Sequence, residues 1–393
     1  MEICMSVSAN KKIAILGVTG SVGMQALDVA VSRGYEVDLI TARGDVEGTL
    51  RAAAALKPRY IAMASADAAR EVSSVLSREG VKVFSGSEGI AEAIHLSNAE
   101  TVVNAIIGEA GLNPTLAVID SGKRLALANK ESLVIAGEIV TSRAKAAGVE
   151  ILPVDSEHSA IFQSLFSGRR EEIKRILLTA SGGPFFGKSR EELSTVTLAD
   201  TLAHPTWKMG KKITVDSATL MNKGFEVIEA AHLFGVSADR IEVVIHRESI
   251  LHSAVEYIDN TVIGELSVPD MRMCVQYAVD YPNRCESVAD ELDLFKLSRL
   301  TFARPDYGAF PLLALAKHSA ELGGAMPAVV NAADEVAVSA FLREEIGFLS
   351  ISEVVHETFE RLTDRRGEHT LEGIKDADLA AREIANELIG EIS

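Results

Sequence analysis

An alternation of short β-branched runs with helical patterns over residues 12 to about 154 constrains the fold more than any other feature. The helical patterns between the runs include Val22–Ser32, Ala66–Arg78 and Leu133–Ala147. Strand–helix alternation of this kind predicts a doubly wound parallel sheet. The expected strands are Lys12–Leu16, Val37–Thr41, Tyr60–Met63, Val81–Phe84, Thr101–Asn104, Arg124–Ala128 and Glu150–Val154.

A glycine-rich segment follows the first expected strand, with the order Gly-Val-Thr-Gly-Ser-Val-Gly over residues 17–23. Glycines let backbone N–H groups approach a pyrophosphate at the N-terminus of the next helix. The spacing is G-x-x-G-x-x-G and not G-x-G-x-x-G, so a plain tight turn is the alternative. The strand before it and the helix after it favour a dinucleotide site.

Polar residues follow two later strands, at the edge of a parallel sheet where ligands bind. Arg124–Ala128 leads into Asn129, Lys130, Glu131 and Ser132. Asn129 can cap the next helix, and this capping role leaves Lys130 available for a ligand.

Asp155 and Glu157 follow the expected strand Glu150–Val154. In extended backbone, residues two apart point the same way, and two converging carboxylates repel unless a cation lies between them. One interpretation is a capping sequence for a helix over Ser159–Phe166. We favour a site for Mg²⁺ or Mn²⁺, completed by Glu226 of a later helix, because oxygen ligands suit hard cations and argue against zinc.

The stretch Ala203–Leu233 carries the densest set of polar and aromatic residues. It predicts a loop with His204 and Trp207, a β-branched strand Ile213–Val215, and a helix to about Phe234 capped by Asp216 or Ser217. Most of that helix is apolar. At about 100° per residue one narrow polar stripe remains, with Lys223 at its flank. A salt-bridged structural helix is the alternative for this stripe, which consists of Asn222, Glu226 and Glu229.

A serine and two glycines, Ser181-Gly182-Gly183, follow the expected strand Arg175–Thr179. Such a turn can form a small anion nest, although a plain turn has the same sequence. Together with three later residues, this turn supplies hydroxyl, amide and ammonium donors for one small dianion. The four donors are Ser181, Ser217, Asn222 and Lys223.

The remaining chain carries fewer chemical signals. Strands are expected at Glu242–His246, Ile250–Tyr257 and Thr261–Val268, residues 286–311 form a linker, and the rest is a small helical bundle. The expected helices of the bundle are Phe310–Leu322, Pro327–Glu345, Ser352–Thr363 and Asp376–Ile392. His246 and His252 are candidates for catalysis, but a lone strand histidine is more often structural. In the bundle, the candidate polar residues are Asn331, Asp334 and Glu335.

Charge and cysteine content exclude several classes of function. The net charge is −17 and no block of Lys and Arg stands out, so we expect no nucleic-acid or anionic-membrane partner. Cys4, Cys274 and Cys285 lack metal spacing, and three is an odd number, which fits reduced thiols in the cytoplasm. Residues 1–10 lack the features of a signal peptide, and no apolar run reaches membrane-spanning length.

Taken together, these segments resemble the 1-deoxy-D-xylulose 5-phosphate reductoisomerase family over nearly the whole chain. Seven motifs in the same order make the resemblance highly specific. They are G-x-T-G-S-V-G at 17–23, A-N-K-E-S-L-V at 128–134, P-V-D-S-E-H at 153–158, S-G-G-P-F at 181–185, H-P-x-W-x-M-G at 204–210, V-D-S-A-T-L-M-N-K-G-x-E at 215–226 and P-D-M-R at 269–272.

The resemblance implies a homodimer with an NADPH domain at residues 1–154, a catalytic α+β domain at 155–290, a linker at 291–311 and a helical domain at 312–393. It implies a divalent metal on Asp155, Glu157 and Glu226. The implied catalytic residues are Lys130, Asp155, Glu157, His158, His204 and Glu226. The implied substrate contacts are Lys130, Ser156, Glu157, Ser181, His204, Trp207, Ser217, Asn222, Lys223 and Glu226. The implied cofactor contacts are Thr19, Gly20, Ser21, Val22, Gly23, Asn129, Glu131 and Gly210, joined by Arg43, Gly44 and Asp45 after the second strand.

The implied reaction converts a keto-sugar phosphate, 1-deoxy-D-xylulose 5-phosphate, into 2-C-methyl-D-erythritol 4-phosphate. The metal would act as a Lewis acid while a carbon–carbon bond breaks and re-forms, and the nicotinamide would then supply a hydride. The loop from His204 to Gly210, covered by Trp207, would close over the site and exclude water. Two other functions are weighed against this one: a metal-independent NAD(P) dehydrogenase of a small hydroxy acid, and a non-catalytic nucleotide-sensing protein.

Two places depart from the family pattern. Arg43-Gly44-Asp45 replaces the usual Gly-Lys/Arg-Asn, and we expect Arg43 to face the 2′-phosphate of NADPH while Asp45 turns towards Arg43 or solvent. Arg247-Glu248 replaces the usual Pro-Gln after His246, and the sequence offers no account of its purpose.

Overall fold

The computed structural model describes residues 11–76, 80–207 and 209–392. The chain folds into two compact units. The first unit comprises Met1–Ser132, Val140–Ser159 and Asp270–Glu291, and the second comprises Leu133–Ile139, Ala160–Pro269 and Leu292–Ser393. The division into domains at 1–154, 155–290 and 312–393, with a linker at 291–311, stays a prediction.

A parallel seven-stranded sheet forms the centre of the first unit, in the order β4-β3-β2-β1-β5-β6-β7. β1 pairs on one side with β2 and on the other with β5, so the strand order reverses at β1. Ligands of such sheets bind beyond the carboxyl ends of the strands at this reversal point. The strands are β1 (Lys12–Leu16), β2 (Glu36–Ala42), β3 (Tyr60–Met63), β4 (Lys82–Ser85), β5 (Thr101–Asn104), β6 (Arg124–Leu127) and β7 (Ile151–Pro153).

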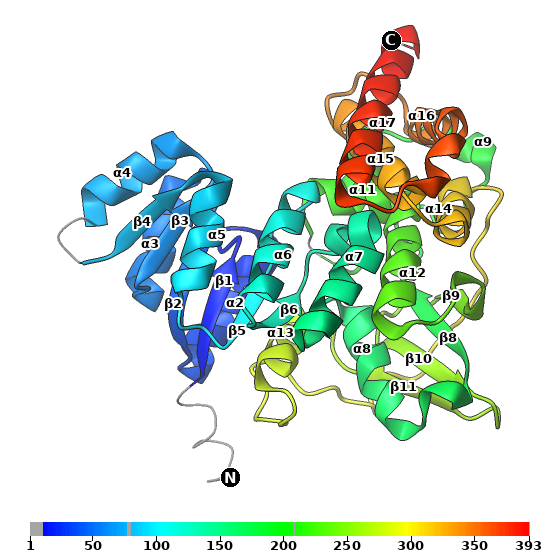
Figure 1. Cartoon of the computed structure of the whole chain (residues 1–393). Helices are drawn as coiled ribbons and strands as arrows, with labels where there is room; N and C mark the ends of the chain where they lie inside the picture. Colours follow the sequence, from blue (N-terminus) through cyan, green and yellow to red (C-terminus); the bar gives the residue numbers. More distant parts are fainter. Residues whose placement is uncertain (1–10, 77–79, 208, 393) are drawn as a thin grey trace. The chain divides into compact units, whose positions relative to one another are not determined.

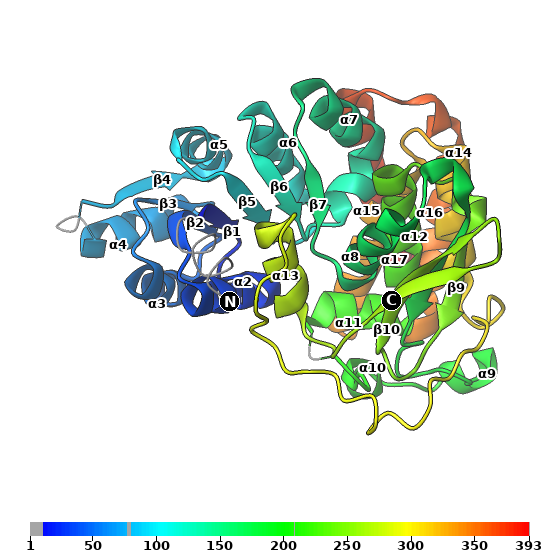
Figure 2. The same cartoon turned by 90° about the horizontal axis from the view of Figure 1, so that it is seen from below.

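Helices cover both faces of this sheet, as parallel strands require. α2, α3 and α13 lie on one face, and α5 and α6 lie on the other (Figure 2). The helices are α2 (Ser21–Arg33), α3 (Val46–Leu56), α4 (Ala66–Leu76), α5 (Gly86–Leu96), α6 (Leu112–Asp120) and α13 (Met271–Asp280). Every expected strand of the unit is present within one or two residues of its expected ends, so the fold prediction is confirmed.

α13 belongs to the first unit although it lies far along the chain, and the sequence patterns did not indicate it. It packs against α2, and Arg272 Nη1 lies 2.8 Å from Asp28 Oδ2. Lys11 Nζ donates to the carbonyl of Val279 at 2.6 Å.

The second unit contains a smaller mixed sheet in the order β11-β10-β8-β9. β8 and β9 are parallel, and β10 runs antiparallel to both of its neighbours. The strands are β8 (Ile173–Ala180), β9 (Ile241–Ile245), β10 (Leu251–Tyr257) and β11 (Val262–Leu266).

One hydrophobic core joins this sheet to the helices of the second unit. It includes Ile176 of the sheet, Phe225 of α12 and Phe359 of α16, all fully buried. In the C-terminal region, α15 packs against α16 and α17 (Figure 1). The helices of this part are α9 (Arg190–Leu193), α10 (Leu198–Leu202), α11 (Lys211–Ala218), α12 (Met221–Phe234), α14 (Pro311–Leu322), α15 (Met326–Leu342), α16 (Phe348–Arg361) and α17 (Leu371–Ile392).

Two helices contribute residues to both units. They are α7 (Glu131–Ala147) and α8 (Ser156–Ser164). α7 departs from helical backbone at Ala136, where φ is −139° and ψ is 37°.

The predicted strand Ile213–Val215 is wrong, because these residues lie within helix α11. The carbonyl of Gly210 accepts both the N–H (3.1 Å) and the hydroxyl (2.8 Å) of Thr214, and Lys212 pairs with Asp216 at i,i+4. These local contacts outweigh the β-branched propensity of a run of three residues.

The predicted helix from Asp216 or Ser217 to Phe234 is also wrong in its start. Leu220 has a φ of +61°, a left-handed conformation that is uncommon outside glycine, and it separates α11 from α12. The chain therefore turns between Ser217 and Asn222, which places them on different helices.

Candidate functional site

The glycine-rich segment joins the carboxyl end of β1 to the N-terminus of α2. Val18 N–H donates to the carbonyl of Thr41 at 2.8 Å, and Gly20 N–H donates to the carbonyl of Gly17 at 3.0 Å, so the loop is tightly folded. A Cβ at Gly23 would lie 2.0 Å from the Gly17 oxygen, which only glycine avoids. No side chain caps α2, so its first N–H groups remain available to an anion.

The segment after β2 places Asp45 at the start of a helix. Its side chain accepts a hydrogen bond from Gly48 N–H at 2.9 Å and caps α3, an additional role that we did not expect, while the residue stays exposed to solvent. The reason is local, since aspartate is among the best N-cap residues and α3 begins at Val46. Arg43 and Gly44 are exposed.

Asn129 holds the loops around it together, as the capping alternative anticipated. Its amide Nδ2 donates to the carbonyls of Ile106 (2.8 Å) and Gly108 (3.0 Å) and to Glu131 Oε2 (2.9 Å). Its Oδ1 accepts the N–H of Ser132 at 3.0 Å. Asn129 therefore ties the loop after β5 to the start of α7.

Lys130 and Asp155 form a nearly buried ion pair, with Nζ 2.9 Å from Oδ2. Asp155 Oδ1 lies 3.3 Å from Nδ1 of the fully buried His158. Burial acts to raise the pKa of Asp155, but the Lys130 ammonium and His158 outweigh it and hold that pKa well below its usual range. Asp155 is thus a charged carboxylate at neutral pH.

The backbone conformation at Glu157 differs from our expectation. α8 begins at Ser156, not at Ser159, so Glu157 lies in the first helical turn and not in extended backbone. The Ser156 hydroxyl donates to Glu157 Oε2 at 2.6 Å. Ser156 can be the first residue of the helix, and the helix dipole favours an acidic residue such as Glu157 in the first turn.

Three residues of the second unit that are distant in sequence converge at one point. His204 Nε2 lies 3.1 Å from the Ser181 hydroxyl and 3.2 Å from the Ser217 hydroxyl. The approach depends on Gly183, where φ is +65° and an added Cβ would lie 2.6 Å from the Ser217 carbonyl oxygen. The turn after β8 therefore fits directly against the end of α11.

The hydrogen bonds of His204 define its tautomer. Nδ1 accepts the backbone N–H groups of Thr206 (3.2 Å) and Trp207 (2.9 Å), so the proton of the neutral ring is on Nε2. Burial, with a contribution from the Arg247 guanidinium, lowers the pKa of His204 to about 4. Nε2–H can then donate to a serine oxygen, which leaves the serine hydroxyl protons free for an anion.

The loop after His204 contains Trp207, whose ring centroid lies 6.2 Å from that of His252. Trp207 is partly exposed, whereas His252 is buried and its Nε2 lies 3.3 Å from the Ser267 carbonyl oxygen. Gly210 ends the loop and caps α11. His252 therefore has a structural partner and supports Trp207.

The polar stripe of α12 is buried and internally bonded. Asn222 Nδ2 donates to Glu226 Oε1 at 2.5 Å, and Lys223 forms an ion pair with Glu226. Lys223, Glu226 and Glu229 are all at least nine-tenths buried. The salt-bridged interpretation of this stripe is thus correct in its contacts, and it leaves a ligand role open.

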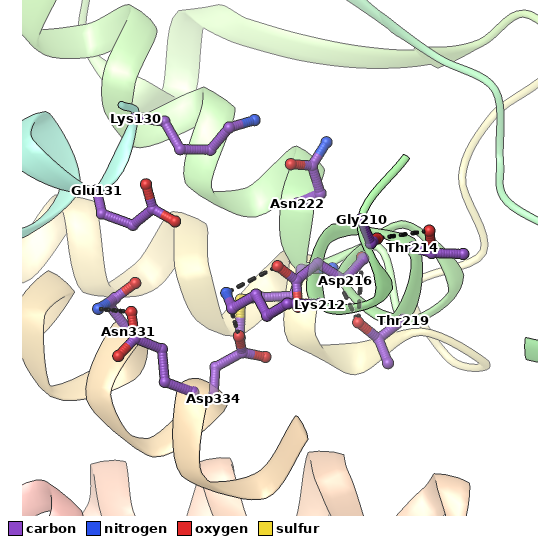
Figure 3. A network of polar contacts seen from close by, with 12 residues as sticks. Lys130, Glu131, Gly210, Lys212, Thr214, Asp216, Thr219, Asn222, Asn331 and Asp334 are labelled. Carbon is purple, nitrogen blue, oxygen red and sulfur yellow. Dashed lines mark hydrogen bonds and ion pairs between the residues drawn. The ribbon is translucent and has the colours of Figure 1, made fainter. Parts of the chain in front are cut away.

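A second polar network links Lys212, Asp216 and Asp334. The sequence analysis named Asp334 as a candidate polar residue but not Lys212. Lys212 Nζ bonds Asp216 Oδ2 at 2.7 Å and Asp334 Oδ2 at 3.0 Å, which ties α11 to α15 (Figure 3). Asn331 of the same helix lies 3.4 Å from Glu335. Burial raises the pKa of Asp334 despite Lys212. Spacing in the sequence could not reveal that Lys212 links the two helices, because its second partner, Asp334, is 122 residues away.

Family models match three parts of the chain. The model "1-deoxy-D-xylulose 5-phosphate reductoisomerase" matches residues 13–137, its "C-terminal domain" matches 151–234, and "DXP reductoisomerase C-terminal domain" matches 266–384. A reductoisomerase of this name from Chlorobium phaeobacteroides is 49% identical over 96% of this chain and 99% of its own length. Another from Caldanaerobacter subterraneus is 49% identical over 95% of this chain and 98% of its own.

Solved structures agree with these matches. The Zymomonas mobilis 1-deoxy-D-xylulose 5-phosphate reductoisomerase in complex with NADPH has a TM-score of 0.90 and 40% identity, covering 97% of this chain and 99% of its own. A DOX-P reductoisomerase in complex with NADPH, fosmidomycin and magnesium has a TM-score of 0.91 and 38% identity, covering 97% and 98%.

A Rossmann-type sheet with a glycine-rich loop, together with buried carboxylates and a hydroxyl–imidazole cluster, defines an oxidoreductase that acts on a small polar substrate. The chain belongs to the 1-deoxy-D-xylulose 5-phosphate reductoisomerase family. Among the described residues, no helix is long and apolar enough to span a membrane.

Proposed function

We propose that this enzyme carries out the family reaction with the residues described above. It rearranges and reduces 1-deoxy-D-xylulose 5-phosphate to 2-C-methyl-D-erythritol 4-phosphate, a step of non-mevalonate isoprenoid biosynthesis, and it depends on NADPH and a divalent metal. The observation that carries this function is the meeting of Ser181, His204 and Ser217, which form a donor cluster suited to a phosphate group. A dehydrogenase of a small hydroxy acid would not need such a cluster.

The glycine-rich loop fits the pyrophosphate of NADPH. The close approach of Gly23 to Gly17 leaves no room for a side chain, and the uncapped N-terminus of α2 supplies N–H donors. We assign Thr19, Gly20, Ser21 and Val22 to the pyrophosphate and Arg43 to the 2′-phosphate. The remaining cofactor contacts are Gly23, Gly44, Asp45, Asn129, Glu131 and Gly210. NADPH supplies the hydride that reduces the substrate.

The carboxylates fit a hard divalent cation. Asp155 is charged, and carboxylate oxygens are the ligands that hard cations prefer. We assign Asp155, Glu157 and Glu226 as the ligands of Mg²⁺ or Mn²⁺. A divalent metal held by these carboxylates would supply Lewis-acid chemistry for the rearrangement.

The residues of this chain have separate tasks around the substrate. Ser181 and Ser217 donate to the phosphate, joined by Asn222 and Lys223, while the Nε2–H of His204 orients the two serines. This binding at the far end of the substrate holds the reactive end in place. Lys130 and Ser156 contact the sugar, and His158 orients Asp155 through Nδ1. Trp207 covers the site and excludes water.

The phosphorylated substrate is a small molecule, and we propose that two copies of the chain form a homodimer in the cytoplasm. The cytoplasmic assignment rests on the three cysteines, an odd number without metal spacing. Cys4 lies outside the described residues.

An assay of NADPH oxidation with 1-deoxy-D-xylulose 5-phosphate tests the function directly. We expect turnover with Mg²⁺ or Mn²⁺ and none without a divalent metal. Turnover that persists in chelator would instead indicate the metal-independent dehydrogenase, and NADPH binding without any turnover would indicate a nucleotide sensor.

Glu226→Gln tests the metal site. The substitution keeps the shape and an acceptor for Asn222 but removes the charge, so we expect turnover to fall by roughly a hundredfold or more and the apparent metal affinity to fall with it. The matched control is Glu256→Gln, which removes another buried carboxylate of the second unit, paired with Lys174 and Arg175. Near-normal turnover of Glu226→Gln would show that the ligand assignment is wrong.

A further inference from the structure

Arg247 directly follows His246, and its side chain reaches one turn of the second unit. Nη1 donates to the carbonyl of Ser181 at 2.9 Å and to the carbonyl of Gly183 at 2.6 Å. The guanidinium carbon lies 5.3 Å from the ring centroid of Phe186. All three partners belong to the segment Ser181–Phe186, which we call the phosphate turn.

The backbone geometry of the turn explains what these contacts achieve. A planar trans peptide points its C=O and the next N–H in opposite directions. When Arg247 holds the Ser181 carbonyl on one side, Gly182 N–H is held pointing away from the guanidinium. The N–H of Gly183 donates to Ser181 Oγ at 3.2 Å, and His204 Nε2 lies on the same oxygen. With both lone pairs engaged, the Ser181 hydroxyl can donate its own proton outward.

Arg247 is itself held between two anchored residues. On one side, Nδ1 of the fully buried His246 lies 2.9 Å from the Thr301 carbonyl oxygen. On the other side, Glu248 accepts the Thr301 hydroxyl at 2.8 Å. These contacts of His246 and Glu248 hold the backbone before and after Arg247. The guanidinium can therefore support the phosphate turn.

The positive charge of Arg247 also acts on the Ser181–His204–Ser217 cluster, where it helps burial to lower the pKa of His204. The same positive potential favours a dianion at that cluster.

We propose that Arg247 is a positioning residue for substrate phosphate in this enzyme: it holds the phosphate turn so that the Ser181 hydroxyl and Gly182 N–H face the anion. This inference rests on the proposed function for the identity of the substrate. A purely structural arginine would stabilise the fold without affecting one ligand more than another, and this difference makes the two roles separable.

The test compares Arg247→Ala, Arg247→Gln and Arg247→Lys with a matched control, Arg240→Ala. Arg240 also donates to two backbone carbonyls, those of Ile173 and Lys174, but these lie at the start of β8, not at the phosphate turn. The measurements are KM and kcat for 1-deoxy-D-xylulose 5-phosphate, Kd for NADPH, Tm, and Kd for inorganic phosphate by calorimetry.

For Arg247→Ala we expect KM for the sugar phosphate and Kd for inorganic phosphate to rise about tenfold or more, because two charge-assisted hydrogen bonds are lost. We expect kcat to change less than about threefold and Kd for NADPH to stay the same. Arg247→Lys should recover part of the phosphate affinity and Arg247→Gln less, since only lysine keeps the charge. Arg240→Ala should lower Tm without changing either phosphate parameter.

The inference is overturned if Arg247→Ala lowers Tm as Arg240→Ala does while KM and phosphate Kd stay at wild-type values. It is equally overturned if the NADPH and phosphate affinities fall together in all Arg247 variants. Phosphate calorimetry needs no turnover, so an inactive wild-type protein would count against the proposed function alone. An active wild type with unaltered Arg247 variants would count against this inference alone.

Discussion

Single residues have roles here that depend on which hydrogen bonds they already make. Asp45 is the clearest case, because its carboxylate caps α3 through Gly48 N–H and cannot rotate freely. The carboxylate remains close to the exposed Arg43 in sequence and is held in one place. A fixed negative charge of this kind disfavours a 2′-phosphate and favours the ribose hydroxyl of NADH.

Asp45→Asn should tighten NADPH binding by on the order of 1 kcal/mol, because one partly screened like charge is removed. Asparagine caps helices as well as aspartate does, so Tm should not fall. Arg43→Ala should raise KM for NADPH and leave that for NADH almost unchanged. Fluorescence titrations of both cofactors check this pair, and equal weakening of NADPH and NADH in Arg43→Ala would mean that another group recognises the 2′-phosphate.

His204 should make stability depend on pH in a defined direction. Its pKa is about 4 in the folded chain and about 6.5 in an unfolded one. Between these values the unfolded chain binds a proton at this residue that the folded chain does not, so acidification favours unfolding. The stabilising contribution of the neutral ring is complete above about pH 6.5 and declines as the pH falls towards 4.

The unfolding free energies of the wild type and His204→Asn should therefore converge as the pH is lowered from about 7.5 to about 5.5. Asparagine does not titrate, and its side-chain oxygen can accept the N–H groups of Thr206 and Trp207. Urea unfolding at several pH values measures the difference, and a gap that does not change with pH would show that His204 titrates normally.

At the scale of elements, the residues that we assign to the site lie mainly at junctions between strands and helices. The loop between β1 and α2, the phosphate turn after β8 and the break at Leu220 between α11 and α12 each end one regular element and begin another. The loop after His204 also follows one regular element, α10, and precedes another, α11. Its principal described contacts are those of His204 with backbone N–H groups and of Trp207 with His252.

Trp207→Ala should reduce kcat/KM by about tenfold or more and change Tm by less than about 2 °C, since a partly exposed loop side chain contributes little to a core. Trp207→Phe should recover part of the activity because it restores an apolar cover. Steady-state kinetics and thermal unfolding on the same samples separate the two effects. Parallel losses of activity and Tm would identify Trp207 as an ordinary packing residue.

For the whole molecule, the two compact units divide the assigned residues between them. The glycine-rich loop, Lys130, Asp155 and Glu157 belong to the first unit, and the phosphate donors and Glu226 belong to the second. In the function we propose, NADPH binding depends mainly on residues of the first unit.

Removal of the metal should accordingly separate binding from turnover. With excess chelator we expect turnover to fall by roughly a hundredfold or more, while Kd for NADPH stays within about twofold, because no assigned ligand of the metal lies in the glycine-rich loop. Added Mg²⁺ or Mn²⁺ should restore turnover. If NADPH affinity fell in step with turnover, the metal would be needed for the folded state and not for catalysis alone.

The sequence by itself determined the class of fold, because a strand of four or five apolar residues and the amphipathic helix after it are local patterns. All seven strands of the parallel sheet could be predicted, as could the glycine-rich loop, whose chemistry lies within seven consecutive residues. The family motifs also pointed to the residues of the candidate site. They could not show how each residue is held.

Tertiary structure decided what local pattern could not express. Leu220 adopted a left-handed conformation that only its surroundings can impose, and Lys212 gained a partner, Asp334, that lies 122 residues further along the chain. The role of Arg247 could be inferred only from the folded chain. There it donates hydrogen bonds to a turn that lies 64 to 66 residues before it. Hydrogen bonds between residues far apart in the chain exist only after folding, and no window of sequence contains both partners.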